Sequence, residues 1–246
     1  MSSGYSLHIG VKHVSPLHYK GWHGFCFPCE NDAIAMSKIA QHQRFDSINI
    51  LLSKNATKKN VRHHILKMSQ KAQAGDIVFL SFSGHGGQIM DKNGDETDNK
   101  DETWCLFDGE IIDDQIHLLL NQFRAGVRII IVTDCCHSGT SIKDGNSLFS
   151  PPFLPLKKEV QKGNSTIKAA VQLIASCQDK ELSKSGDPYS LFTECLLKVW
   201  EEGHFQGDYV LFFQKIKQTM PFSQVPNHLK IGTTPSAFLR EKPFSI

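Results

Sequence analysis

Two short apolar runs rich in β-branched residues constrain the fold of this chain more than any other feature. Residues 76–82 and 128–133 have the pattern of strands buried on both faces, and each run stops at a polar segment that contains glycine. Ser-Gly-His-Gly-Gly follows the first run at 83–87, and Asp-Cys-Cys-His-Ser-Gly follows the second at 134–139. Such strands are typical of a parallel sheet, whose ligand crevice lies beyond the carboxyl ends of its strands. We therefore expect the chemistry of this protein at these two strand ends.

The rest of the chain alternates predicted strands with amphipathic helices. Further strands are expected at 5–11, 47–52, 169–175 and 228–231, and helices at 30–42, 55–73, 113–123, 189–200 and 209–220. This alternation predicts an α/β/α sandwich with a central, mostly parallel six-stranded sheet and helices on both faces. Because no repeat or change of composition divides the sequence, residues 1–246 are predicted to form one domain, with an exposed loop at about 143–165.

The composition excludes several classes of protein. A net charge of +2, from 27 basic and 25 acidic residues, is too balanced to favour nucleic acid or an anionic membrane as a partner. No apolar stretch approaches the roughly 18 residues of a membrane-spanning helix, and no secretion signal is recognised, so we expect a cytoplasmic protein. The seven cysteines, an odd number with one adjacent pair, are expected to be core thiols and one reactive group rather than disulfides.

His85 and Cys136 suit a general base and a nucleophile held in adjacent loops. A cysteine thiolate attacks a carbonyl carbon, and a neighbouring imidazole first takes the thiol proton and later protonates the leaving amine. The glycines after His85 allow backbone amides to approach a substrate, so the N–H groups of Gly86 and Cys136 are expected to form an oxyanion hole. Alone, either residue is more simply a turn histidine or a small buried thiol, but their placement at two strand ends favours catalysis.

Taken together, the motifs resemble those of the metacaspases, a caspase-like family of cysteine peptidases. They comprise C-E-N-D-A at 29–33, S-G-H-G-G at 83–87, D-E-T-W-C-L ending at 106, G-x-I-I-D-D at 109–114, D-C-C-H-S-G at 134–139, A-S-C-Q-D at 175–179 and S-L-F-T at 190–193. His85 and Cys136 lie 51 residues apart, close to the roughly 50 of caspases. The resemblance extends over residues 5 to about 231 and implies a caspase-like fold.

The resemblance also implies cleavage after arginine or lysine, with a pocket formed by Cys29, Asp32, Ser83 and Asp134. Carboxylates beside a nucleophile independently favour a cationic substrate side chain. For Asp134, the alternative is a cap on the following turn. Cys29 also belongs to a C-x-x-C motif with Cys26, but the sequence has no second such motif to complete a zinc site, and we prefer the pocket assignment over zinc or redox chemistry.

A calcium ion is a further implication of the resemblance, as an activator, since the chemistry itself requires no cofactor. The expected ligands are Asp98, Asp101, Asp113 and Asp114. A last acid is expected near position 143, where this sequence has Lys143 followed by Asp144. In the alternative interpretation, Asp113 and Asp114 occupy the first turn of a helix, where its dipole favours negative charge.

The leading hypothesis is a cysteine endopeptidase that cuts proteins or peptides after arginine or lysine and processes itself in the lysine-rich loop, at Lys157, Lys158 or Lys162. The family resemblance associates it with cell death or antiviral defence, with a separate activator protein or small-molecule signal, and with a monomeric state. The alternative is a catalytically silent caspase fold that acts as a binding or scaffold module. A nucleotide enzyme of Rossmann type is disfavoured because no G-x-G-x-x-G follows the first strand.

Overall fold

A parallel sheet forms the centre of the computed structural model, which describes residues 2–90, 100–136, 167–176, 187–222, 224–232 and 235–246. Its main strand order is β2-β1-β3-β6-β7-β8. These strands are β1 (Gly4–Gly10), β2 (Ser47–Leu52), β3 (Ile77–Met90), β6 (Arg128–Cys136), β7 (Ala170–Ala175) and β8 (Asn227–Gly232). Neighbouring strands are parallel except for β7 and β8. The predicted six-stranded, mostly parallel sheet is confirmed.

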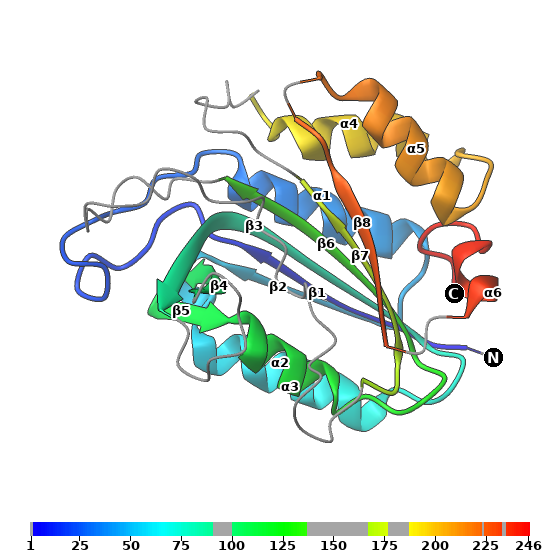
Figure 1. Cartoon of the computed structure of the whole chain (residues 1–246), viewed down its shortest axis with the longest axis horizontal. Coiled ribbons are helices and arrows are strands. Elements are labelled where there is room, and N and C mark those ends of the chain that lie inside the picture. Colours follow the sequence, from blue (N-terminus) through cyan, green and yellow to red (C-terminus); the bar gives the residue numbers. More distant parts are fainter. Residues whose placement is uncertain (1, 91–99, 137–166, 177–186, 223, 233–234) are drawn as a thin grey trace.

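Helices cover both faces of this sheet (Figure 1). One face carries α1 (Cys29–His42), α4 (Leu191–Trp200) and α5 (Tyr209–Thr219), and the other carries α2 (Lys58–Lys71) and α3 (Asp113–Leu120). A short α6 (Ser236–Leu239) and two 3-10 turns, Ser53–Asn55 and Glu201–Gly203, complete the helical elements of the described residues. None of the helices in this part of the chain is long and apolar enough to cross a membrane.

The two faces of the sheet bury different kinds of side chain. On the α1, α4 and α5 face, Phe79, Phe192 and Phe212 lie in one core cluster that is rich in aromatic rings. On the α2 and α3 face, aliphatic residues such as Ile65 and Leu120 form the larger cluster. Each of these fully buried side chains stabilises the fold by about 1.5 to 3 kcal/mol relative to its exposed state. The alternating pattern of the sequence therefore produces a three-layer structure.

β3 is longer than predicted, because the glycine-rich segment after position 82 continues the strand instead of turning. β3 pairs with β6 as far as His85 and then pairs with the antiparallel β4 (Lys100–Leu106) from Gly86 onward. A Cβ atom at Gly87 would lie 2.8 Å from the Thr103 hydroxyl, so glycine is needed there for the close approach of β4. β6 likewise runs to Cys136 rather than ending at 133. The expected adjacent loops are thus the ends of two paired strands.

β4 and β5 (Gly109–Ile112) form an antiparallel pair that the sequence did not predict. β4 carries Asp101 and Glu102, residues that are depleted in strands, and β5 has only four residues. The predicted exposed loop at about 143–165 lies outside the described residues.

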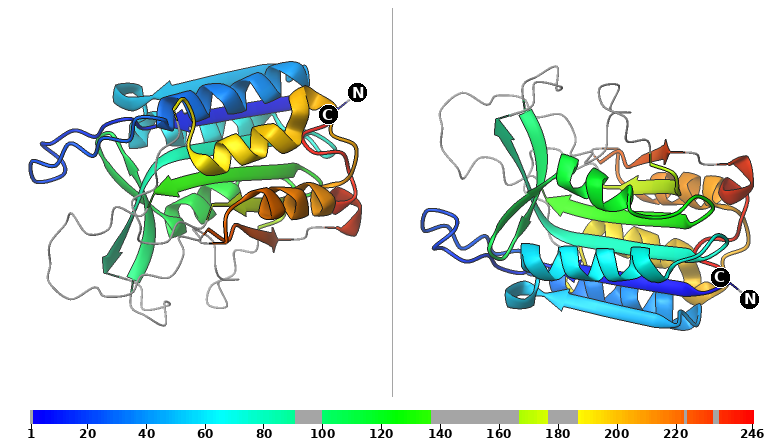
Figure 2. Two further views of the ribbon diagram at one scale, coloured as in Figure 1. Left: turned by 90° about the horizontal axis from the view of Figure 1, so that it is seen from above. Right: turned by 90° about the horizontal axis from the view of Figure 1, so that it is seen from below.

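The segment between β1 and α1, residues 11–28, projects at the carboxyl ends of the parallel strands (Figure 2). Two backbone hydrogen bonds pair its outgoing and returning halves: Val14 N–H to the carbonyl of His23 at 3.0 Å and Cys26 N–H to the carbonyl of Lys12 at 2.8 Å. We call this segment the β1–α1 hairpin. It brings residues 12–14 and 23–26 together beside the end of β3, because Val11 N–H also donates to the carbonyl of Ser83.

Candidate active site

The register of β3 and β6 brings the two predicted catalytic positions together. Position 85 is the parallel partner of position 136, and position 83 is the partner of position 134. Neighbouring strands in a sheet lie about 4.8 Å apart, so the backbones at positions 85 and 136 are close enough for a shared reaction centre. The structure describes Cys136 by its backbone, at the last position of β6. Both residues therefore lie at the carboxyl end of the central strands, where the sequence placed the chemistry.

The imidazole of His85 is buried against an aromatic residue of the β1–α1 hairpin. The side chain of His85 is 6% exposed, and the centre of its ring lies 4.9 Å from that of Trp22, with the planes tilted by 54°. Trp22 is itself held by an edge-to-face contact with Tyr19, whose hydroxyl donates to the carbonyl of Leu106 at 2.7 Å. These contacts fix the orientation of the imidazole from the hairpin side.

Asp32 and Ser83, both expected in the substrate pocket, are in contact beside positions 85 and 136. Asp32 lies in the first turn of α1 and is 1% exposed, and its Oδ2 accepts a hydrogen bond of 2.7 Å from the hydroxyl of Ser83 on β3. Its other oxygen accepts a bond of 3.0 Å from the backbone N–H of Ser190. The side chain of Asp32 is therefore fixed between three elements of the fold.

Asp134 is held by the start of α4. One of its carboxylate oxygens accepts hydrogen bonds from the hydroxyl of Ser190, and from the N–H and hydroxyl of Thr193 at 3.2 and 3.0 Å. Ser190 is the N-cap residue of α4, so the partial positive charge of the helix N-terminus favours a carboxylate here. These donors come from Ser190 and Thr193, 56 and 59 residues further along the chain, whereas the turn that Asp134 was alternatively expected to cap lies outside the described residues.

Asp32 and Asp134 form a buried pair of like-charged groups. Burial and, after it, the nearby Asp134 carboxylate raise the pKa of Asp32 to about 7, against the opposing effect of the hydrogen bonds from Ser83 and Ser190. Burial also raises the pKa of Asp134. Two enclosed carboxyl groups that repel one another favour the arrival of a positive charge, and pKa values perturbed in this way concentrate at functional sites.

The comparisons with known proteins agree with this geometry. Residues 7–144 match the model of the family described as "Metacaspase, peptidase C14 domain". The chain belongs to the metacaspase family. It is 36% identical over 125 residues to metacaspase-1 of Eremothecium gossypii, and 34% identical over 153 residues to metacaspase-1B of Aspergillus fumigatus. These matches cover 48% and 56% of this chain, but 27% and 36% of the relatives, so the chain corresponds to about a third of their length.

Two solved structures extend the comparison beyond the matched segment. A crystal structure of a protein from Geobacter sulfurreducens is 39% identical to this metacaspase, covers 99% of each chain and has a TM-score of 0.84. Caspase-1 of Spodoptera frugiperda, at 11% identity and a TM-score of 0.58, covers 95% of this chain and 88% of its own. The second similarity shows the shared caspase-like fold. Metacaspases are cysteine peptidases, and thus hydrolases.

The structure corrects the expectation for the C-x-x-C motif of this metacaspase. Cys26 and Cys29 form a disulfide, with Cα atoms 5.7 Å apart, and both are buried. Cys29 begins α1 and lies one helical turn before Asp32, so it is near the pocket but does not present a free thiol to it. The pairing arises because the β1–α1 hairpin and the first turn of α1 return the two sulfur atoms to one place. The expectation of core thiols is met by Cys105 and Cys195, which are free and buried, and Cys135 is buried as well.

Gly86 lies next to His85, where β3 takes β4 as its partner and Trp104 is opposite. The backbone of Cys136 ends β6 beside His85. The two positions expected to form an oxyanion hole are thus adjacent in the sheet, on neighbouring strands. Their role as amide donors to a substrate remains a prediction.

The acids expected to bind calcium are only partly brought together. Asp101 lies buried on β4, Asp113 and Asp114 begin α3, and Asp98 lies outside the described residues. Burial, followed by the charges of Glu102, Asp114 and Asp101, raises the pKa of Asp113 to about 7. Within the described ranges, no group of three or more His, Cys, Asp or Glu side chains is arranged to hold a metal ion. These residues do not form a complete site without the segment that contains Asp98, and calcium remains a prediction.

Three residues of the site were not assigned by sequence reasoning. Ser190 and Thr193 belong to the S-L-F-T motif, and their position near the start of the helix predicted at 189–200 was a usable signal for carboxylate donors. Trp22 lies in the β1–α1 hairpin, and no pattern in the sequence pairs it with His85. Its contact depends on the tertiary path of that hairpin.

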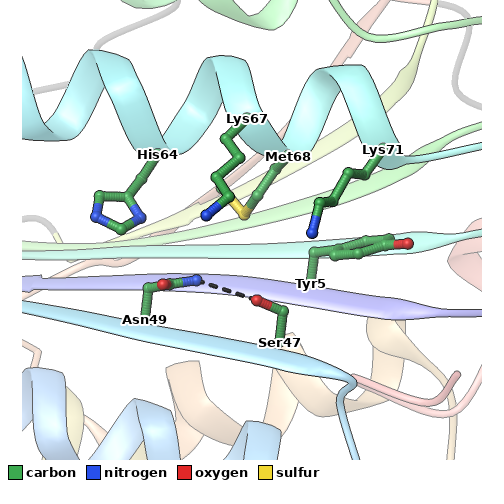
Figure 3. Close-up of a pocket in the computed structure, with 7 residues that line it drawn as sticks. All are labelled: Tyr5, Ser47, Asn49, His64, Lys67, Met68 and Lys71. Atoms are coloured by element: carbon green, nitrogen blue, oxygen red, sulfur yellow. Dashed lines mark hydrogen bonds between the residues drawn. The ribbon is translucent and has the colours of Figure 1, made fainter.

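A small cavity elsewhere in the molecule is distinct from this site. It lies between α2 and the strands β1 and β2, where His64, Lys67 and Lys71 reach toward Tyr5, Ser47 and Asn49 (Figure 3). It contains none of the predicted catalytic, substrate or metal residues and no carboxylate. We assign it no part in the chemistry of the strand ends.

Proposed function

We propose that this metacaspase is an endopeptidase that cleaves peptide bonds after arginine or lysine through Cys136 and His85. The observation that carries the proposal is the buried pair Asp32 and Asp134, which lies beside the dyad positions and is oriented by hydroxyl and amide donors. Such a pair suits a guanidinium or ammonium group, because two carboxylates satisfy its donors and its charge removes their mutual repulsion.

The chemistry proceeds in two stages. The thiol of Cys136 gives its proton to His85 and the sulfur bonds to the scissile carbonyl carbon, while the N–H groups of Gly86 and Cys136 stabilise the oxyanion. The C–N bond then breaks as the imidazolium protonates the leaving amine, which leaves an acyl-enzyme. Water, deprotonated by His85, attacks this thioester and releases the carboxylate product, and the proton returns to the sulfur.

The finer parts of the proposal rest on the family. They are self-processing at Lys157, Lys158 or Lys162, which lie outside the described residues; activation by calcium, by a separate protein or by a small-molecule signal; a monomeric, cytoplasmic enzyme; and a role in cell death or defence. No part in nucleic-acid or membrane binding is proposed. Intact mass measured during prolonged activation tests self-processing, and an unchanged full-length mass contradicts it.

A catalytically silent scaffold is the second candidate. It would use the same organised carboxylate pair for binding, although the chain retains both residues of the proposed dyad. A scaffold would bind a basic peptide without cutting it. The two functions therefore differ in turnover and not in recognition.

The deciding experiment is hydrolysis of aminocoumarin peptides that end in Arg, Lys, citrulline, Asp or Ala, with and without calcium. We expect release after Arg or Lys in the wild type and none in Cys136→Ala. Cys135→Ala is the matched control, because its thiol is buried in the core beside the nucleophile position. Release that survives in Cys136→Ala, or is lost equally in Cys135→Ala, contradicts the assigned nucleophile. If no peptide is cut, failure of an arginyl electrophile to label Cys136 supports the scaffold.

A further inference from the structure

A row of stacked aromatic rings stands exposed on the β1–α1 hairpin. His23 and Phe25 stack with ring centres 5.9 Å apart and planes 9° from parallel, and Phe25 and Phe27 stack at 6.2 Å and 16°. Phe25 is 62% exposed and Phe27 is 69% exposed. We call these three side chains the aromatic ladder. An isolated exposed apolar residue is ordinary, but adjacent exposed rings in a fixed stack are typical of a recognition surface.

The backbone of the hairpin holds the ladder in this arrangement. Exposed and buried residues alternate from 23 to 28, so His23, Phe25 and Phe27 share one face while Gly24, Cys26 and Pro28 are buried on the other. Cys26 is bonded to Cys29, and Gly24 has a positive φ of 52° and packs under the ring of Trp22, where a Cβ atom would lie 3.0 Å away. The rings are therefore presented by a rigid segment.

Contacts at the edges of the ladder add to this rigidity. The Lys12 ammonium lies 5.6 Å from the centre of the Phe27 ring. His13 contacts both Phe25, at 6.4 Å between ring centres, and Phe107 of the turn between β4 and β5, at 5.9 Å. The ladder is thus connected to the β4–β5 pair that continues from β3.

The position of Trp22 relates the ladder to the reaction. In the proposed mechanism His85 protonates the leaving amine, so the polypeptide that follows the scissile bond must pass the imidazole. Trp22 packs against that imidazole at 4.9 Å and directly precedes His23 in the chain. The hairpin therefore contacts the imidazole that the polypeptide after the cut must pass.

We propose that the aromatic ladder binds an aromatic or large apolar side chain within the first four substrate residues after the cut. This inference rests on the proposed function and adds a second determinant of substrate choice to it. The occupant is a segment of the substrate polypeptide, because the hairpin that carries the ladder also contacts, through Trp22, the imidazole that this segment must pass. Because the rings are already held in a rigid stack, binding orders them little further, and the entropic cost of binding the substrate side chain is small.

The test compares substrates that have a peptide after the cut with substrates that do not. Quenched fluorescent peptides with Arg at the cut and Phe, Ala or Asp at each of the next four positions report on the ladder. Coumarin amides have no residue after the cut and report on the dyad and the carboxylate pair alone. We expect the wild type to prefer Phe over Ala by about tenfold in kcat/KM at one of these positions.

The double variant Phe25→Ala with Phe27→Ala should abolish this preference while coumarin amides are cut at the wild-type rate. Phe222→Ala, which removes a fully exposed phenylalanine outside the hairpin, should retain it. A wild type without a Phe preference, or a double variant that loses coumarin and peptide cleavage equally, overturns the inference and leaves the proposed function intact.

A second measurement decides the matter if no substrate is cut. Fluorescence anisotropy of labelled peptides that carry Arg followed by Phe or by Ala is measured with the Cys136→Ala protein. Tighter binding of the Phe peptide that is lost with the ladder variants supports the inference. Equal binding of both peptides, or no binding, overturns it.

Discussion

Two acidic groups in this protein each contain a carboxyl whose pKa is raised to about 7, yet they are built in different ways. Asp32 lies with Asp134 among donors from β3 and α4, which hold both oxygens of Asp32 in place. Asp113 lies among Glu102, Asp114 and Asp101, and the favourable contact that opposes its shift is a backbone N–H. A pKa of about 7 therefore occurs both at Asp32, whose oxygens are oriented by hydrogen-bond donors, and at Asp113, which is surrounded mainly by repelling acids. Orientation, more than acidity, distinguishes a site for a substrate side chain.

Removing one charge from the oriented pair should produce the largest effect. Asp32→Asn and Asp134→Asn keep the shape but leave a guanidinium with one anion, and loss of one partner of a buried charge pair costs about 2 to 5 kcal/mol. We expect kcat/KM for Arg substrates to fall ~30-fold to ~4,000-fold, with little change for citrulline substrates. Asp113→Asn, measured without calcium, is the matched control and should leave the Arg-to-citrulline ratio unchanged. An equal loss for both substrates contradicts the pocket assignment.

The pH dependence of selectivity is the next largest effect. Because the pKa of Asp32 is about 7, its carboxylate forms as the pH rises through 7 and is lost below it. The Arg-to-citrulline ratio of kcat/KM should therefore rise by up to about tenfold per unit below pH 7 and level off above it. The ratio cancels the ionisation of Cys136 and His85, which affects both substrates. A ratio that is flat from pH 5 to 9, or a slope that persists in Asp32→Asn, would show that another group sets the selectivity.

Removal of the hydroxyl of Ser190, the residue that bonds both carboxylates, should have a smaller effect. Ser190→Ala removes the hydrogen bond to Asp134 and keeps the backbone N–H that binds Asp32. A lost hydrogen bond of this kind costs about 1 kcal/mol, so we expect KM for Arg substrates to rise about fivefold with kcat nearly unchanged. Ser37→Ala, a helix hydroxyl that bonds a backbone carbonyl within α1, is the control. A fall in kcat alone would place Ser190 in the chemistry rather than in binding.

The unoriented group should affect stability more than catalysis. The folded pKa of Asp113 lies above its ordinary value of about 3.9, so its contribution to stability is present below pH 4 and is lost as the pH rises through 7. Asp113→Asn, which is always neutral, should raise Tm at pH 8 by about 2 to 4 °C and have little effect at pH 4. Asp187→Asn, an exposed acid, serves as the control.

The same Tm measurement, made with added calcium, tests whether these acids bind the ion. If the acids bind the ion, added calcium should raise Tm of the wild type at pH 8 through preferential binding to the folded state, and Asp113→Asn should lose this response. An equal response in both proteins would move the calcium site away from α3.

Much of the fold followed from local patterns, and its departures have identifiable causes. Buried runs such as 128–133 predicted the central strands, because such runs are apolar on both faces. The continuation of β3 through Gly84 and Gly87 could not be predicted, since glycine is usually a breaker and here serves the close packing of β4. The acidic strand β4 was missed because its stability depends on its partners rather than on its composition.

The candidate site, like the fold, could be predicted from the sequence only in part. Asp32, Ser83 and Asp134 could be named because the motifs of the family mark them, and the structure brings all three together. The Cys26–Cys29 disulfide was not expected, because the count and the adjacent pair of cysteines argued against disulfides without revealing how the hairpin folds back. The contact of Trp22 with His85 could not be predicted for the same reason. The two residues are distant in the sequence, and only the path of the β1–α1 hairpin brings them together.

The exchange of partners along β3 has a consequence for local stability. Residues 77–83 are flanked by β1 and β6, whereas residues 86–90 are paired with β4. Amide protons in the first stretch should exchange with solvent at rates set by global unfolding, and those in the second at rates set by opening of the β4–β5 unit alone. The boundary falls between His85 and Gly86. We therefore expect the proposed base and the proposed oxyanion donor to belong to units of different cooperativity, so that a ligand that orders β4 and β5 organises the reaction centre without altering the core.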